Sequence, residues 1–352
     1  MSRSALRPLV IVAVVAAVGL VTWWGATGLA EWASGLGGGP DATIVAGQEV
    51  VVVVPEGSTA RSIAGLLEEE GVIAASAFDQ AVRERSAGAQ LQAGEYTLVS
   101  GSSADVIIDA LVAGPVIETY RLTIPEGLRV DEILDVIVRE SPIERSELES
   151  ALLSGAVTSS LLQDTDEASL QDWEGLLFPD TYEFFDDATA ADVLGLLADT
   201  MEQRVAAVDW SGLEEAGFTV YEGIVMASLI ESEAAIDEDR PLIASVIANR
   251  LEMGMRLQID ATVLYALDRR GGAVTLDDLQ VDSPWNTYRV DGLPPTPIGA
   301  PGVASLEAAA APAESDYLFY VLTSTDGSHS FTVDYDEFLA LKDQAKADGV
   351  IP

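Results

Sequence analysis

The hydrophobic pattern of this chain begins with one long apolar run. Leu9–Ala30 is a stretch of 22 residues without a formal charge, and a helix of that length spans roughly 33 Å, about one bilayer core. Arg3 and Arg7 precede the run. The pattern predicts a transmembrane helix with residues 1–8 in the cytoplasm. The alternative, a cleaved signal peptide, usually has a shorter apolar run of about 7–15 residues.

Downstream of this stretch the apolar residues come in short runs. A Gly- and Ala-rich segment at 31–47 is typical of a flexible tether. Glu49–Val54 has the composition of a β-strand, and a Pro-Glu-Gly turn at 55–57 ends it, because proline sets φ and glycine permits the reversal. Apolar residues at helix spacing follow a Ser-Thr cap. With a strand-like segment at 91–98, this order predicts a small α+β module at 48–115.

The same order of elements recurs 70 residues further along. A strand-like segment at 121–124 precedes a second Pro-Glu-Gly turn at 125–127, and apolar residues from Val130 to Ile137 form a helical face. Two copies do not make a solenoid, which needs at least three. We therefore predict a second strand–turn–helix unit at 116–171 that leads into the next domain.

From residue 172 onward helical patterns dominate, and we predict a domain at 172–352. Helices are predicted at 189–204, 220–235 and 241–253. A loop at 282–302 follows and contains five prolines. Such a density of proline stiffens the backbone, so we expect the loop to form a rigid wall. A terminal α+β segment starts at Tyr317. The pattern as a whole predicts an α+β protein.

Composition excludes several classes of function. The chain has 352 residues, with 18 Lys+Arg against 58 Asp+Glu, a formal net charge of −40, one histidine and no cysteine. Cysteine nucleophiles, disulfide frameworks and zinc or iron–sulfur sites therefore lack their ligands, and we expect no metal and no cofactor. An acidic chain repels phosphates, which argues against nucleic-acid binding. The hydrophobic share of 49% is enough for a folded core.

The segment Tyr221–Ala234 is apolar on nearly every side of a helical wheel, which predicts a buried helix. Glu231 and Glu233 interrupt it near its end. At about 100° per residue, Glu231 lies beside Ala227 and Ser228, whose small side chains would leave a slot above its carboxyl, and Glu233 points to the opposite side. Burial would raise the pKa of Glu231 and suit a general acid. Alternatively the helix ends here and both carboxylates reach water. Periodicity alone does not separate the roles of the two glutamates.

Polar residues further along could line a groove near this helix. Gln258, Asp260 and Thr262 alternate after a glycine helix stop, which predicts a strand that presents three polar groups to one side. Asn286 and Tyr288 lie in the proline-rich loop. Carboxylates, amides, hydroxyls and aromatic rings suit a polysaccharide cleft, because sugars offer hydroxyls for hydrogen bonds and apolar ring faces for stacking.

Several longer phrases carry a family resemblance. They are EGLLFPDTYEF at 174–184, ASLIESEA at 227–234, RPLIASVIANRLEMGMRLQIDATV at 240–263, SPWNTYRVDGLPPTPIGAPG at 283–302 and GSHSFTVDYDEF at 327–338. Together they resemble the YceG-like family of membrane-bound endolytic murein transglycosylases. The resemblance extends over nearly the whole chain, from Leu9 to about Lys342, and departs at Ala300, where the family often has asparagine.

The resemblance implies a lytic transglycosylase that cleaves the MurNAc-β-1,4-GlcNAc bond of peptidoglycan and leaves a 1,6-anhydro-MurNAc end. It places the helix-borne catalytic glutamate at Glu231, which would act first as acid and then as base. The implied substrate contacts are Glu174, Gln258, Asp260, Thr262, Asn286, Tyr288 and His329. Two of these residues have an alternative role: Glu174 could brace a turn, and His329 could be structural.

The resemblance also implies a location and partners. Residues 48–115 resemble the LysM-like domain of the family, which would hold peptidoglycan strands near the membrane. Leu9–Ala30 would cross the bacterial plasma membrane once and leave the following domains outside the cytoplasm, near peptidoglycan synthases of the elongation machinery. Two other functions stay open. One is a non-catalytic, membrane-anchored peptidoglycan-binding scaffold, and the other is a hydrolytic muramidase that uses Glu231 and a second acid such as Asp260.

Overall fold

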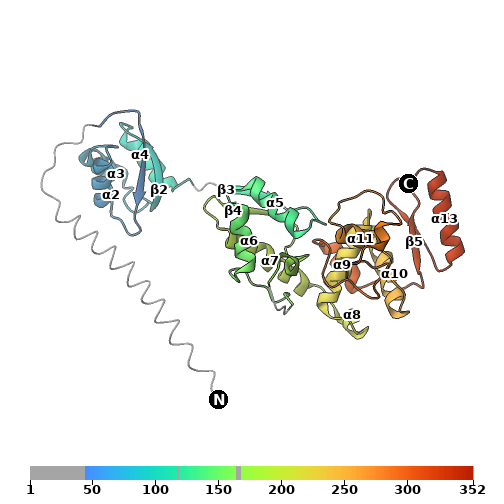
Figure 1. Ribbon diagram of the computed structural model, residues 1–352. Helices are drawn as coiled ribbons and strands as arrows, with labels where there is room; N and C mark the ends of the chain where they lie inside the picture. The colour runs from blue at the N-terminus through green and yellow to red at the C-terminus, as the bar shows by residue number, and fades with distance from the viewer. Residues whose placement is uncertain (1–43, 117–118, 164–167, 352) are drawn as a thin grey trace, which may run out of the picture. The chain divides into compact units, whose positions relative to one another are not determined.

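The computed structural model describes residues 44–116, 119–163 and 168–351. The chain divides into two compact units, Met1–Val116 (unit 1) and Ile117–Pro352 (unit 2), each of which folds around its own core (Figure 1). The predicted transmembrane helix at Leu9–Ala30 lies outside the described residues. Among the residues that are described, no helix is both long enough and apolar enough to cross a bilayer.

The described part of unit 1 combines a two-stranded antiparallel sheet with helices. Strand β1 (Glu49–Val54) pairs with β2 (Gly94–Val99), and Val52 lies opposite Tyr96. Thr59 caps the first helix by accepting a hydrogen bond from the Ser62 N–H, as the sequence predicted. The helices are α2 (Ala60–Glu69), α3 (Ala75–Arg85) and α4 (Ala104–Ala113).

Unit 2 begins with a second strand–turn–helix unit built in the same order. Strand β3 (Thr119–Thr123) leads through the turn into α5 (Val130–Glu140), and β4 (Thr181–Phe185) pairs antiparallel with β3. Gly57 and Gly127 have φ of +74° and +73°, a left-handed conformation that glycine adopts without strain. This explains why both turns end in glycine. The helices that follow are α6 (Arg145–Leu153), the short η1 (Leu170–Trp173) and α7 (Ala190–Ala207).

Helices dominate the rest of unit 2. They are α8 (Ser211–Glu215), α9 (Val220–Glu233), η2 (Asp237–Asp239), α10 (Arg240–Glu252), α11 (Asp260–Ala266), η3 (Asp278–Gln280), α12 (Val303–Ala310) and α13 (Tyr335–Ala347). A hairpin of β5 (Phe319–Leu322) and β6 (His329–Thr332) contacts α13, in line with the predicted terminal α+β segment. The proline-rich loop 282–302 contains neither helix nor strand. The predicted α+β architecture is confirmed.

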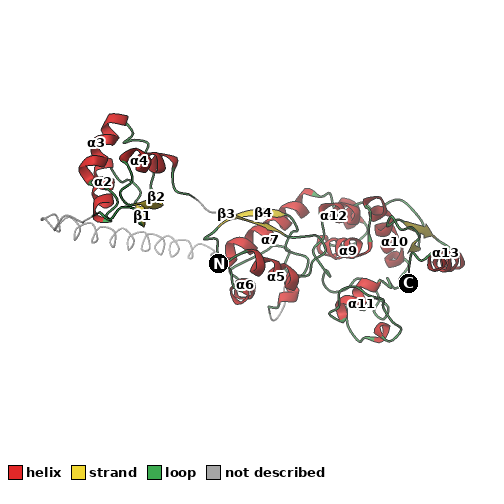
Figure 2. Ribbon diagram, turned by 90° about the horizontal axis from the view of Figure 1, so that it is seen from above, coloured by secondary structure: helices red, strands yellow, loops and turns green. Residues whose placement is uncertain are grey.

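Helix α9 lies at the centre of the second half of unit 2. Helices α10 and α12 flank it (Figure 2). All its residues from Gly223 to Ile230 are buried, which confirms the predicted buried helix. Glycine is required at position 223 because a Cβ there would lie 2.4 Å from the Trp210 ring. One cluster of buried residues extends from Leu122 to Ala310, so the strand–turn–helix unit and α9 share a core.

The predicted strand through Gln258, Asp260 and Thr262 is wrong. Gln258 has a φ of +52°, outside the extended region, and Asp260 is the first residue of α11. The Thr262 hydroxyl donates to the Ile259 carbonyl at 2.6 Å. Such a local bond between side chain and backbone competes with the hydrogen bonds of a sheet, so alternation of polar residues here marks a tight turn into a helix.

Candidate active site

Helix α9 carries two glutamates in its last turn. The helix starts with a capping box in which the Glu222 carboxylate accepts a hydrogen bond from the Thr219 N–H at 2.7 Å, and the Thr219 hydroxyl oxygen accepts one from the Glu222 N–H. It ends at Glu233. Glu231 and Glu233 are about 200° apart around the helix axis, so they meet different segments of unit 2.

The Glu231 carboxylate accepts hydrogen bonds from two neighbouring helices. Arg240, the first residue of α10, contacts both oxygens, at 3.2 Å and 3.1 Å. Oε2 also accepts from the Gly302 N–H at 3.0 Å and from the Ser305 hydroxyl at 2.9 Å, at the start of α12. The side chains of Arg240 and Glu231 are 10% and 8% exposed. The sequence predicted an open slot beside this carboxyl, and a cavity of about 530 Å³ does border Glu231 and Ser228. The ion pair with Arg240 was not predicted.

The Glu233 carboxyl lies half-buried on the other side of the helix. It accepts a hydrogen bond from the Tyr320 hydroxyl at 3.0 Å. Burial raises the pKa of Glu233 to about 7, and the negative charge of Asp260 acts in the same direction, against the hydrogen bonds from Tyr320 and the Ala261 N–H. This carboxyl therefore holds its proton to a higher pH than an exposed glutamate does.

Asp260 and Tyr288 lie beside Glu233 and contact each other. The Tyr288 hydroxyl donates to Asp260 Oδ1 at 2.6 Å. Burial raises the pKa of Tyr288, and Asp260 and Glu233 add to the rise, so its hydroxyl stays protonated. Gln258 is exposed in the adjoining turn, and its left-handed backbone is of the kind that clusters at functional sites. The structure thus brings Asp260 and Tyr288 to the last turn of α9, and Gln258 lies next to them.

Thr262 and Asn286 are both 0% exposed and join two segments of the site. The Thr262 hydroxyl lies 2.9 Å from that of Thr287. The Asn286 amide donates to two backbone carbonyls, at 3.0 Å and 2.8 Å, and its Oδ1 accepts from the Tyr288 N–H at 3.1 Å. Both were predicted to contact substrate, but their polar atoms bond within the protein. Their effect in this structure is to fix the positions of Asp260 and Tyr288.

Glu174 and His329 also bond internally. Glu174 is 2% exposed and accepts hydrogen bonds from the first N–H of α5 at 2.9 Å and from the Tyr265 hydroxyl at 3.0 Å. Burial raises its pKa to about 7. His329 Nδ1 lies 2.9 Å from Asp239, and the His329 ring packs edge-on against Tyr320, with 5.6 Å between centroids. Glu174 therefore braces α5, and His329 supports the tyrosine that contacts Glu233.

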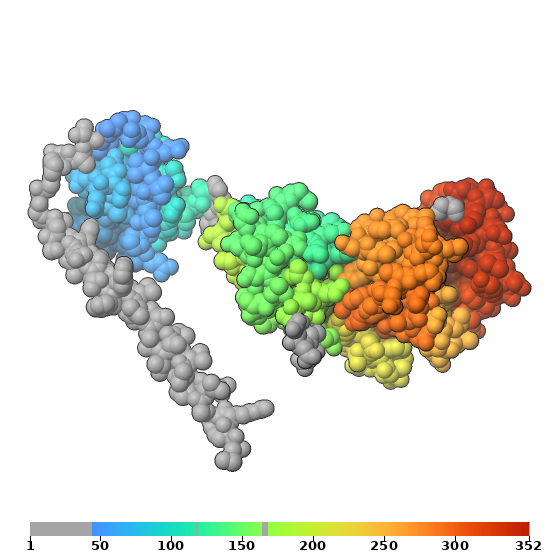
Figure 3. Space-filling model, in the orientation of Figure 1, coloured from blue at the N-terminus to red at the C-terminus, as the bar shows by residue number. Residues whose placement is uncertain are grey.

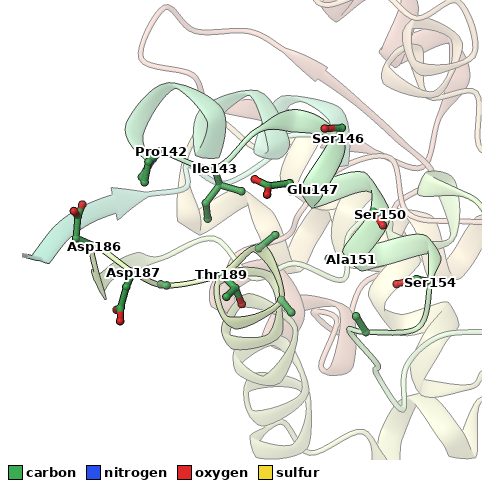
Figure 4. Close-up of a pocket in the computed structure, with 14 residues that line it drawn as sticks. Pro142, Ile143, Ser146, Glu147, Ser150, Ala151, Ser154, Asp186, Asp187 and Thr189 are labelled. Carbon is green, nitrogen blue, oxygen red and sulfur yellow. The ribbon is translucent and has the colours of Figure 1, made fainter. Parts of the chain in front are cut away.

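Two cavities of unit 2 differ in their relation to α9. One, of about 530 Å³, is lined by residues around the second Pro-Glu-Gly turn, by Glu231 and Ser232 of α9, and by Ala261. It belongs to the region where the green and orange segments meet in Figure 3. The other, of about 590 Å³, is lined by α6 and the β4–α7 connection, with Glu147 and Asp186 among its residues (Figure 4). Only the first of these two borders the last turn of α9.

Sequence reasoning missed three side chains that contact the two glutamates. Tyr320 is 87 positions from Glu233, and Ser305 is 74 positions from Glu231, so no local spacing indicates either contact. The position of Arg240 in the sequence did indicate such a contact. A cation at the first position of a helix interacts unfavourably with the helix dipole, which indicates that a partner from another part of the chain stabilises it.

Comparison with known proteins identifies the family of this chain. The model of the YceG-like family matches residues 52–344. This chain belongs to the YceG-like family. An endolytic murein transglycosylase of Bacillus subtilis (strain 168) is 33% identical over 294 residues, which cover 80% of this chain and 81% of that protein. The resemblance inferred from the motifs is therefore confirmed.

Two further relatives extend this comparison. An endolytic murein transglycosylase of Streptococcus pneumoniae (strain R6) is 35% identical over 159 residues, which cover 44% of this chain and 29% of that protein. A crystal structure of a YceG-like protein from Listeria monocytogenes has a TM-score of 0.56 and 33% sequence identity. The match covers 84% of this chain and 99% of that chain. Most of this chain therefore shares its fold with the solved YceG-like protein.

Proposed function

We infer that this protein is an endolytic lytic transglycosylase that cleaves the MurNAc-β-1,4-GlcNAc bond of peptidoglycan and leaves a 1,6-anhydro-MurNAc end. The relatives named endolytic murein transglycosylase support this activity, since one of them matches most of both chains. The observation that carries the proposal is the Glu231 carboxyl in the last turn of the buried helix α9. It borders a cavity of about 530 Å³ that the second Pro-Glu-Gly turn also lines, and it is held there by Arg240 and Ser305.

The positions of the two glutamates favour Glu231 as the general acid, in agreement with the motif resemblance. A general acid donates a proton to the leaving group, so its carboxyl must reach the substrate. Glu231 lines the cavity of about 530 Å³ beside the last turn of α9. Glu233 lies on the other side of the helix against Tyr320 and is not among the residues that line this cavity.

The reaction then needs one carboxyl group. Protonated Glu231 donates to the glycosidic oxygen while the bond from that oxygen to C1 of MurNAc breaks. The Glu231 carboxylate accepts the proton of the C6 hydroxyl of the same sugar, and the C6 oxygen closes on C1. Glu231 is protonated again at the end. Most glycosidases need two carboxyl groups, but here the nucleophile belongs to the substrate. Asp260 would stabilise the positive charge that develops on the sugar.

A hydrolytic muramidase that uses Glu231 and Asp260 is the second candidate, because Asp260 begins α11, which contacts α9. In that reaction Asp260 would activate or replace the nucleophile, and water would supply the oxygen of the new end. The two reactions differ in their products, since hydrolysis leaves a reducing MurNAc end and transglycosylation leaves an anhydro end.

The test is product analysis by mass spectrometry after incubation of the full chain, in detergent, with purified peptidoglycan in H2 18O. We expect internal cleavage and anhydro-MurNAc ends without 18O, and no products from Glu231→Gln. Reducing ends that contain 18O would instead establish the muramidase. Intact strands that sediment with folded protein would favour the non-catalytic scaffold. Products from Glu231→Gln at the rate of the unchanged protein would reject Glu231 as the acid.

The proposal includes a location. Leu9–Ala30 would anchor the chain in the bacterial plasma membrane as a single span, with residues 1–8 in the cytoplasm and units 1 and 2 outside. The uncharged run of 22 residues supports this arrangement. Residues 48–115 would act as a LysM-like module that holds glycan strands near peptidoglycan synthases. External protease added to spheroplasts should then degrade both units, and protection of unit 2 would reject this topology.

A further inference from the structure

The cavity beside Glu231 gathers positive charge in a protein that is otherwise acidic. We use "the Glu231 cavity" for the space of about 530 Å³ that Glu231 and the second Pro-Glu-Gly turn line. The chain has only 18 Lys+Arg against 58 Asp+Glu, yet Arg129, Arg269 and Arg270 all line this cavity. The cavity of about 590 Å³ on α6 is lined by one glutamate and two aspartates and by no basic residue.

The balance of charge in the Glu231 cavity depends on the protonation of Glu231. The carboxyl groups in its lining are those of Glu126, Glu132 and Glu231, against the three guanidinium groups named above. A general acid must carry its proton before the bond breaks. In that state two carboxylates remain against three guanidinium groups, so the form of the enzyme that is ready to react would attract an anionic part of its substrate.

The Arg270 side chain is held in a fixed orientation at this cavity. Its Nε donates to the Glu132 carboxylate at 2.7 Å, and its Nη2 donates to the other oxygen of that carboxylate and to the Gly127 carbonyl at 3.0 Å. Nη1 takes part in none of these bonds, and 47% of the side chain is exposed. Arg269 instead pairs with Asp278, outside the cavity, at 3.0 Å. Arg270 therefore offers a preorganised cation with a donor to spare.

Arg129 is a second, more deeply buried cation of the same cavity. Its side chain is 10% exposed, and its guanidinium carbon lies 4.9 Å from the centre of the Tyr265 ring. Burial and the positive charge of Arg270 lower the pKa of Arg129. Its Nε–H has no hydrogen-bond partner among the described residues, although most buried donors have one. An anion at Arg270 would offset the repulsion between these two cations.

The proposed substrate has an anionic group close to the bond that is cleaved. The sugar rings of peptidoglycan are uncharged, but the lactyl group of each MurNAc carries a peptide with free carboxylates. Glu231 has to reach the glycosidic oxygen next to a MurNAc, which brings the peptide of that MurNAc to the Glu231 cavity. A guanidinium group binds a carboxylate with directed hydrogen bonds as well as charge.

We propose that Arg270, with Arg129 behind it, binds a carboxylate of the peptide attached to MurNAc, so that the enzyme prefers strands whose peptides carry this charge. The inference rests on the proposed function, because the carboxylate belongs to the proposed substrate. Arg270 is then a specificity-determining residue, and the Glu132 carboxylate and the Gly127 carbonyl hold its guanidinium group in place.

The experiment compares two forms of soluble, uncrosslinked peptidoglycan strands. One form is unmodified, and in the other the peptide carboxylates are converted to amides with a water-soluble carbodiimide and excess ammonia, which removes the charge and keeps the size. The kcat/KM for release of new MurNAc ends is measured for the full chain, Arg270→Gln and Arg204→Gln. Arg204 is the matched control, since its side chain is also 47% exposed and pairs with a carboxylate, that of Asp180, but does not line the cavity.

Amidation should lower the kcat/KM of the unchanged protein and of Arg204→Gln by about 10-fold, because a hydrogen bond between charged groups is lost. Arg270→Gln should lose a similar factor on the unmodified strands and nothing more on amidation. This failure of additivity is the result of a direct contact between the two altered groups. A merely structural role of Arg270 would instead lower the activity on both forms by the same factor.

Two results would overturn the proposal. One is equal cleavage of both forms by the unchanged protein, and the other is an Arg270→Gln variant that remains as sensitive to amidation as the unchanged protein. If Arg270→Gln does not fold, Arg270→Lys replaces it, because lysine keeps a charge beside Glu132 but lacks the guanidinium fork. Its sensitivity to amidation should fall in part, and full sensitivity would overturn the proposal. Failure of the proposed function looks different, since the unchanged protein would then release no ends from either form.

Discussion

Replacing Glu174 by glutamine should change how the stability of unit 2 depends on pH. Glu174 is 2% exposed, and burial raises the pKa of its carboxyl from 4.5 to about 7, against hydrogen bonds from Val130 and Tyr265. The folded protein therefore holds this proton more tightly than the unfolded chain does. The stability contributed in this way is fully present below the unfolded pKa and is lost as the pH rises through about 7.

The magnitude follows from the rise in pKa. One pKa unit corresponds to about 1.4 kcal/mol, so a rise from 4.5 to about 7 corresponds to about 3 kcal/mol in the free energy of unfolding. Glutamine does not ionise, and its amide can accept from the Val130 N–H while it donates to the Tyr265 oxygen. As the pH rises from 5 to 8, the free energy of unfolding of Glu174→Gln should therefore increase by about 2–3 kcal/mol relative to that of the unchanged protein. The difference is less than the full value of about 3 kcal/mol because the unchanged protein has already lost a small part of this stability at pH 5.

The assay is urea unfolding at pH 5 and pH 8, followed by tryptophan fluorescence in a chain that lacks residues 1–43. The tryptophans left in that chain, Trp173, Trp210 and Trp285, all lie in unit 2. Glu202→Gln is the control of opposite sign, because hydrogen bonds from Ser159 and Ser160 lower the pKa of Glu202. That variant should be less stable than the unchanged protein at pH 8, and the difference should narrow toward low pH. If the free energies of unfolding of Glu174→Gln and of the unchanged protein differ by the same amount at both pH values, the reasoning is refuted.

Three other predictions concern activity and packing. Glu231→Gln should lose about 10²- to 10⁴-fold in kcat, measured by release of anhydro ends, and an unchanged kcat would reject Glu231 as the acid. Gly175→Ala should destabilise unit 2 by clearly more than Gly217→Ala in urea unfolding. Both glycines have positive φ, but a Cβ at position 175 would lie 2.4 Å from Pro297, and one at position 217 meets nothing within 4 Å. A strain cost of about 1–2 kcal/mol is common to both, so equal losses would contradict the steric argument. Thr262→Val keeps the shape of a fully buried side chain but removes its hydroxyl bonds. It should cost about 1–3 kcal/mol in the same assay, and an unchanged midpoint would show that those bonds contribute nothing.

Local sequence was sufficient for the features that depend on neighbouring residues. The strand at 49–54, both Pro-Glu-Gly turns and the buried helix that bears the glutamates follow from side-chain periodicity and from the backbone preferences of proline and glycine. A loop at 282–302 without helix or strand was predictable for the same reason, since each proline restricts its own φ. These properties act over a few residues, so one sequence is enough to predict them.

The surroundings of the two glutamates were decided by contacts between distant segments. Glu231 and Glu233 are chemically identical and two positions apart, yet one meets Arg240 and Ser305, and the other meets Tyr320. Periodicity states which side of a helix a residue occupies, but it contains no information on which segment packs against that side. A desolvated carboxyl and an ion-paired carboxyl therefore look the same in sequence, and only the folded chain separates them, because their difference is the electrostatic environment created by packing.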